Sequence, residues 1–83
     1  MKFEELDGVK TLRDFPDEGI KKGEIGTVVF VFEKPDEAYE VEFCFETGET
    51  KAMFAILPND LELLKTYTHK YSPENNFRYV SGK

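Results

Sequence analysis

The stretch from Gly23 to Phe45 constrains the fold of this chain more than any other. Its first part, Thr27 to Phe32, contains only β-branched and aromatic residues, which pack well on a pleated surface and lose side-chain freedom in a helix. Its last part, Tyr39 to Phe45, alternates apolar side chains with glutamates and a cysteine, as a half-buried strand does. Between them, residues 33–37 contain a proline and short acidic side chains that favour a turn. The stretch therefore predicts a β-hairpin.

This hairpin is expected to supply most of the apolar core. A uniformly apolar run of strand length is usually buried on both faces, which places Thr27–Phe32 at the centre of the domain. The aromatic side chains expected to fill the core are Phe30, Phe32, Phe43 and Phe45. We expect Gly23 to adopt a positive φ at the turn into the strand. Gly26 is expected to mark a bulge or a close strand crossing that leaves no room for a Cβ.

Segments on either side of the hairpin predict three further strands, so the expected fold class is all-β with five strands. Val9–Leu12 is expected to form the first strand, and the loop after it turns inward at Phe15 and Ile20. Thr50–Ile56 is the fourth strand and follows a tight turn at Gly48.

The segment after the fourth strand has two interpretations. Leu57–Asp60 contains a proline and predicts a short 3₁₀ turn, and Leu61–Leu64 then alternates as a short closing strand does. The competing interpretation is a helix capped by Asn59 or Asp60 and running to Tyr67, because capping side chains are present.

The chain, at 83 residues, is long enough for one domain. We expect residues 1–64 to form it and residues 65–83 to form a C-terminal extension, with a turn at 73–76 and a strand at 77–80. The aromatic side chains of the extension predict that it packs on the domain or on a second copy. With no apolar leader, no membrane-spanning run and one cysteine, a cytoplasmic location without a disulfide is expected.

The distribution of charge is more informative than the net charge of −6. Residues 33–49 carry seven acids and a single base, Lys34, whereas residues 50–83 carry five bases and three acids. Phosphate backbones are bound by clusters of Lys and Arg, and the sequence has none. A basic protein is therefore the expected partner, and neither nucleic acid nor a membrane is.

Acidic side chains of the hairpin form the candidate partner-binding site. They are Glu33, Asp36, Glu37, Glu40, Glu42 and Glu46. A solvated outer face is the default interpretation of these residues, and partner binding is the functional one. Catalysis by carboxylates needs a cleft that separates their pKa values, and a calcium-binding loop needs a different spacing. His69 has no ligand at metal-binding spacing, and acidic neighbours raise rather than lower the pKa of Cys44. No catalytic residue, cofactor or metal is therefore expected.

Two elements, KGEIGTVV at residues 22–29 and AYEVEF at residues 38–43, are the most specific motifs of the chain. Further positions of the same pattern are Leu6, Asp7, Val9, Asp14, Phe15, Pro16, Thr50, Ala52, Leu57 and Pro58. Together they resemble the small bacterial domain-of-unknown-function family numbered 4926, over about residues 3–64. The resemblance implies a compact SH3-like β-barrel, usually a stand-alone chain, with no assigned activity or catalytic residues. An association of such small genes with toxin neighbourhoods suggests an immunity role.

The first element is also similar to the KOW motif of ribosomal and transcription-elongation barrels, in which a glycine and a lysine-bearing loop meet RNA or protein. The same spacing suits any barrel that needs a glycine turn before a strand. The expected function is thus a small non-enzymatic protein-binding module, in its sharpest form an immunity protein or antitoxin whose acidic face blocks a basic toxin. The alternatives are a self-associating structural domain, such as a homodimer, and a KOW-like RNA-binding barrel.

Overall fold

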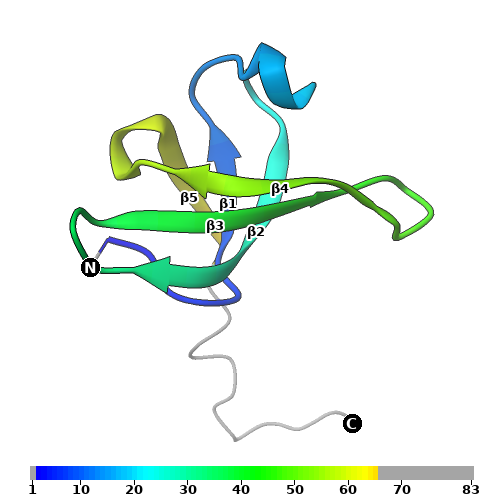
Figure 1. Cartoon of the computed structure of the whole chain (residues 1–83). Helices are drawn as coiled ribbons and strands as arrows, with labels where there is room; N and C mark the ends of the chain where they lie inside the picture. The colour runs from blue at the N-terminus through cyan, green and yellow to red at the C-terminus, as the bar shows by residue number, and fades with distance from the viewer. Residues whose placement is uncertain (1, 66–83) are drawn as a thin grey trace, which may run out of the picture.

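The computed structural model describes residues 2–65, the last of them by its backbone alone. These residues fold into five antiparallel strands in one sheet. The strands are β1 (Gly8–Thr11), β2 (Ile25–Phe32), β3 (Ala38–Cys44), β4 (Thr50–Ile56) and β5 (Leu61–Lys65), with two 3₁₀ turns, η1 (Pro16–Glu18) and η2 (Pro58–Asp60), between them (Figure 1). The predicted all-β class with five strands is confirmed.

The sheet bends around one core. Its strand order is β4-β3-β2-β1-β5. In Figure 1, β3 and β4 cross the front of the molecule while β1 and β5 lie behind them. Register shifts interrupt the β1–β5, β2–β3 and β3–β4 ladders, and such bulges increase local twist. Among the described residues β4 and β5 each pair on one side only, so closure into an SH3-like barrel stays a prediction.

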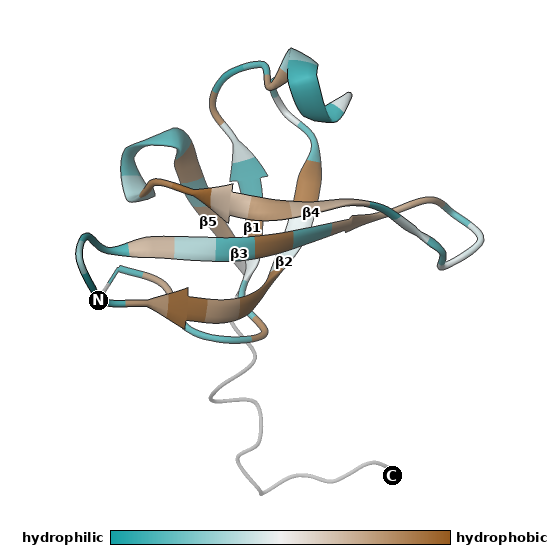
Figure 2. Ribbon diagram, viewed as in Figure 1, coloured by the Kyte–Doolittle hydropathy of each residue, from teal (hydrophilic) through white to brown (hydrophobic). Residues whose placement is uncertain are grey.

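The core draws side chains from every strand. Its buried members are Phe3, Val9, Phe15, Ile20, Val28, Tyr39, Val41, Phe43, Ile56 and Leu61. Figure 2 shows the corresponding apolar stretches along the strands, with hydrophilic residues concentrated in the connections. Phe15 and Ile20 pair as an isolated bridge that closes the loop around η1, which confirms the prediction that both turn inward.

Gly26 lies where β2 passes close to β3. A Cβ at this position would be 2.6 Å from Val41 Cγ1 and 2.8 Å from the carbonyl oxygen of Glu42, both closer than van der Waals contact permits. The predicted close crossing at Gly26 is therefore confirmed. Gly23 and Gly48 adopt φ of 92° and 95°, as predicted for their turns.

The predicted aromatic core is wrong in part. Phe43 is fully buried, but Phe30 and Phe45 are about half exposed and Phe32 is only partly buried. Phe45 follows the end of β3, where its N–H and C=O close the turn to β4 by bonding Glu49 and Gly48. Of the run from Thr27 to Phe32, only Val28 is fully buried, so the expectation of burial on both faces is also wrong.

Several strand boundaries differ from prediction by one or two residues: β1 begins at Gly8, β2 at Ile25 and β3 at Ala38, while β3 ends at Cys44 and β5 at Lys65. The first strand ends at Thr11, because the N–H of Leu12 donates to Asp60 near η2, and Leu12 is exposed. The segment after η2 is a strand from Leu61, so the alternative of a helix over these residues is wrong. The predictions for the turn at 73–76, the strand at 77–80, His69 and the packing of the extension fall outside the described residues.

Candidate functional site

One extra residue in β2 decides which side chains reach the outer face of the sheet. Val28 and Phe30 lie opposite consecutive residues of β3, so Val29 between them is a bulge. Because side chains alternate along a strand, one extra residue exchanges the faces of all that follow. Phe30 and Phe32 therefore point away from the core, and Val31 packs against it instead.

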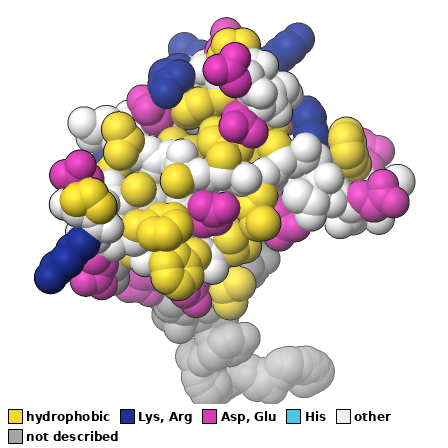
Figure 3. All heavy atoms as spheres, in the orientation of Figure 1, with side chains coloured by type: hydrophobic (Ala, Val, Ile, Leu, Met, Phe, Trp, Pro, Cys, Tyr) yellow, Lys and Arg dark blue, Asp and Glu magenta, His cyan; other side chains and the backbone are white. Residues whose placement is uncertain are grey.

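The outer face of β2, β3 and β4 is a mixed apolar and acidic surface, which we call the β3 face. Its residues are Phe30, Phe32, Glu40, Glu42, Met53 and Ala55. The rings of Phe30 and Phe32 meet edge to face, with centroids 4.9 Å apart, and the side chain of Met53 is 51% exposed. Figure 3 shows this side of the molecule, with hydrophobic side chains spread over the three strands and acidic ones among them.

Two carboxylates of the β3 face lie among its apolar side chains. Glu40 is opposite Ala55 on β4, and Glu42 is opposite Met53 and accepts a hydrogen bond from the Thr50 hydroxyl. The ion pairs of the described residues use other acids, namely Glu24, Asp60 and Glu62. Glu40 and Glu42 thus form no ion pair with a cation of residues 2–64, and their charge is available to a cation from elsewhere.

The other predicted site residues do not join this surface. Glu33 and Asp36 are exposed in the turn between β2 and β3, at one end of β3, and Glu46 is exposed in the turn to β4, at the other end. The structure therefore separates the predicted acidic site into two turns and a central pair.

Glu37 is engaged in fixing the N-terminal segment. The hydroxyl of buried Tyr39 donates to the Glu37 carboxylate and accepts hydrogen bonds from the N–H groups of Lys2 and Phe3, at 2.8 and 3.0 Å. The Lys2 N–H also donates to Glu37. These hydrogen bonds, that from Tyr39 first, lower the pKa of Glu37, and burial together with Glu37 raises the pKa of Tyr39. Glu37 has a structural role.

Cys44 lies two residues beyond Glu42 on β3 and is exposed. Desolvation by its surroundings and the nearby Glu42 carboxylate raise the pKa of the Cys44 thiol. Because the thiolate is the nucleophilic form, this environment disfavours covalent catalysis at Cys44, in the direction that the sequence predicted.

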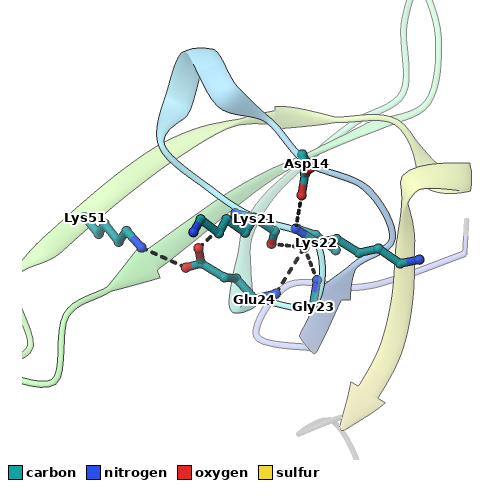
Figure 4. Close-up of polar contacts among 7 residues, drawn as sticks. Asp14, Lys21, Lys22, Gly23, Glu24 and Lys51 are labelled. Atoms are coloured by element: carbon teal, nitrogen blue, oxygen red, sulfur yellow. Dashed lines mark hydrogen bonds and ion pairs between the residues drawn. The ribbon is translucent and has the colours of Figure 1, made fainter.

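The main-chain N–H groups of residues 21–24 are used within the protein (Figure 4). These residues include Lys22 and Gly23 of the KGxxG motif at residues 22–26, and we call them the KGxxG loop. The N–H of Lys22 donates to the Asp14 carboxylate at 2.7 Å, and the N–H of Gly23 donates to both the carbonyl and the hydroxyl oxygen of Thr11. An RNA phosphate held by this loop would need such donors unpaired. The arrangement supports the interpretation of the motif as a structural turn.

Glu24 connects the same loop to the edge of the sheet. Its carboxylate accepts from the N–H of Lys21 and forms an ion pair with Lys51 on β4, each at 2.9 Å (Figure 4). These interactions, the backbone hydrogen bond first, lower the pKa of Glu24. They hold the start of β2 against β4.

A shallow, open pocket of about 260 Å³ lies between the η1 loop and β4. The Arg13 guanidinium stacks over the Phe15 ring at 4.1 Å and bonds Asp60, and Phe54 of β4 forms the opposite wall. The exposed carboxylates of Asp17 and Glu18 also line the pocket, whereas none of its lining residues carries a hydroxyl, thiol or imidazole group.

Neither a metal centre nor a membrane helix emerges from the part of the chain that the structure describes. Within residues 2–65 no three His, Cys, Asp or Glu side chains converge as metal ligands would. No helix there has the length and apolarity needed to cross a membrane.

Comparison with known proteins gives a family match. The family model described as "Domain of unknown function (DUF4926)" matches residues 5–63, well over half of the chain. No curated protein and no solved structure gives a significant match. The matched region contains β1 to η2 and all residues of the β3 face.

Proposed function

The chain belongs to the DUF4926 family, a family of unknown function, and we propose that it acts as a small non-enzymatic module whose β3 face binds a basic segment of a partner protein. The observation that carries this proposal is the position of Glu40 and Glu42. Both lie among half-exposed apolar side chains, without an ion pair to any cation of residues 2–64. Exposed apolar surface marks interaction sites, and a basic group of a partner would complement these two carboxylates.

The chemistry of the β3 face selects for arginine in the partner. A guanidinium bonds a carboxylate through two parallel N–H groups and stacks on aromatic rings, so one Arg side chain can contact Glu40 and the ring of Phe30, which lies opposite Glu40. A lysine ammonium group is a point charge on a flexible stem, so it lacks the planar fork that makes this two-point contact. The acidic turns at each end of β3 steer a basic partner toward the face at long range.

A narrower form of the proposal identifies the partner as a basic toxin in the same cytoplasm. The protein would then act as an immunity protein or antitoxin by covering the basic surface that the toxin uses for nucleic acid. The net charge of −6, concentrated in residues 33–49, supports this form.

The test uses three versions of the full chain as bait in an extract of the native cells. They are the wild type, the charge-reversed pair Glu40→Lys with Glu42→Lys, and the control pair Glu5→Lys with Glu62→Lys. The control changes the net charge equally at two exposed acids outside the β3 face, one before β1 and one on β5. Each captured protein is identified, purified and titrated against all three versions.

We expect one basic protein that binds the wild type and the control pair but binds the charge-reversed pair at least about 30-fold more weakly, as expected for a buried charge pair that is broken. Equal binding to the wild type and the charge-reversed pair, with the latter still folded, would refute the proposal. So would the recovery of acidic proteins alone.

Self-association is the second candidate function, and the open edge of β4 favours it. Within the described residues β4 pairs with β3 alone, it contains no proline, and its one charged side chain, Lys51, is paired with Glu24. In light scattering we expect the mass to rise from the monomer to the dimer value with concentration, and to stay monomeric when exposed Ala55 on this edge is replaced by lysine. A constant monomeric mass would exclude it.

A further inference from the structure

The β3 face has an excess of apolar and acidic groups that residues 2–65 leave uncovered. The side chain of Phe30 is 49% exposed. On the β4 side, the residue opposite Glu40 is Ala55, whose small methyl group leaves the carboxylate accessible. A surface that exposes an aromatic ring beside two carboxylates favours a segment that carries both apolar and cationic side chains.

The composition of residues 66–83 complements this surface. They contain three bases, Lys70, Arg78 and Lys83, against the single acid Glu74. They also contain four of the aromatic residues of the chain, Tyr67, Tyr71, Phe77 and Tyr79. A segment that is both basic and aromatic matches a face that is both acidic and apolar, by charge and by hydrophobic contact.

Chain length permits the contact within one molecule. β5 ends at Lys65, and β3 is three strand spacings away in the sheet order, or about 15 Å along a flat sheet. Eighteen extended residues span up to about 60 Å, so residues 66–83 reach the β3 face even around a bent sheet.

Because residues 66–83 are covalently attached to the domain, even a weak intrinsic affinity for the β3 face would keep them bound. A segment joined by a short linker has an effective concentration on the order of 1 mM, so an intrinsic dissociation constant of about 0.1 mM already leaves the face occupied most of the time. We propose that residues 66–83 bind the β3 face of their own chain through Lys70 and Arg78 to Glu40 and Glu42, and that a basic partner must displace them. The inference rests on the proposed function only for the choice of face.

Cys44 provides a probe in the full-length protein. As an exposed cysteine of β3 next to Glu42, it accepts a nitroxide spin label beside the β3 face. The label broadens the NMR signals of nearby amides, so residues 70–80 in ¹⁵N-labelled protein should lose most of their intensity. This loss of signal intensity should be absent in the double variant Glu40→Lys, Glu42→Lys and in the double variant Lys70→Glu, Arg78→Glu. The loss of intensity should persist in the Glu5→Lys, Glu62→Lys control.

An equimolar mixture separates contact within one chain from contact between chains. In it, ¹⁵N-labelled protein carries no nitroxide, and nitroxide-labelled protein carries no ¹⁵N. Broadening in this mixture would assign the face to a second copy and overturn the proposal. Absence of broadening in the protein that carries both ¹⁵N and the nitroxide would also overturn the proposal. So would broadening that is unchanged by charge reversal at Glu40 and Glu42. No partner is present, so this result is independent of the capture experiment.

Discussion

Phe30 lies directly opposite Glu40 across the β2–β3 ladder, on the face away from the core. The pairing places an aromatic ring beside a carboxylate that has no cation among the described residues. It exists because Val29 is an extra residue in β2. Without that bulge, Phe30 would follow Val28 onto the inner face, and the surface around Glu40 would lose its aromatic side.

The first prediction concerns the stability contributions of Phe30 and Phe43. Phe30→Thr removes a half-exposed ring and one edge contact with Phe32, so the free energy of unfolding should fall by no more than about 1 kcal/mol. Phe43→Ala empties a fully buried site and should cost about 3–5 kcal/mol. Urea unfolding followed by circular dichroism measures both.

If Phe43→Ala does not fold, Phe43→Leu keeps the comparison measurable, since a smaller cavity costs less. Equal losses for Phe30→Thr and Phe43→Leu would contradict the outward position of Phe30.

Much of the fold follows from local chemistry that the sequence displays. The alternation from Tyr39 to Phe43 identifies β3 and its inner face, and the tight turn at Gly48 separates it from β4. Proline in Leu57–Asp60 stops β4 and allows the 3₁₀ turn that leads to β5. These features act within a few residues of the chain, which is why they can be read before the structure is known.

The composition of the β3 face could be predicted only in part. Glu40 and Glu42 follow from alternation along one strand, but Phe30 and Phe32 depend on the position of a bulge, and a run of Val and Phe shows the same apolar character on both faces. Glu37 resembles its acidic neighbours in the sequence. Its engagement with Tyr39 and Lys2 depends on the path of the N-terminal segment, which no local pattern reports.

Replacement of Gly26 by alanine should destabilise the protein through overpacking. The new methyl group would overlap Val41 Cγ1 and the Glu42 carbonyl oxygen, so we expect a loss of about 1–3 kcal/mol or more. The double variant Gly26→Ala, Val41→Ala removes the overlap with the Val41 side chain but keeps the close contacts with the Glu42 carbonyl oxygen and the Phe43 ring. It should therefore be less destabilised than the sum of the single variants, as measured in a double-mutant cycle. A Gly26→Ala protein with wild-type stability would disprove the close crossing.

Thr11 should stabilise the KGxxG loop through its hydroxyl group. This group accepts from the N–H groups of Gly23 and Glu24, donates to the carbonyl of Lys21, and is almost fully buried. Thr11→Val keeps the shape and loses these bonds, so the free energy of unfolding should fall by about 1–3 kcal/mol. Thr11→Ser keeps the hydroxyl and should lose less. The prediction fails if the valine variant is at least as stable as the serine variant.

Glu37 should make stability depend on pH in the acidic range. Hydrogen bonds from Tyr39 and Lys2 hold its pKa below the ordinary value of 4.5 in the folded protein. As the pH falls, Glu37 therefore takes up a proton in the unfolded chain before it does so in the folded protein. The stabilisation by the Glu37 carboxylate is thus present above pH 4.5 and is lost as the pH drops through the folded pKa. Urea midpoints between about pH 3 and pH 7 should fall less steeply for Glu37→Gln than for wild type. Glu33→Gln, in the same turn, should follow wild type, and a Glu37→Gln profile parallel to wild type would show that the Tyr39 contact contributes nothing.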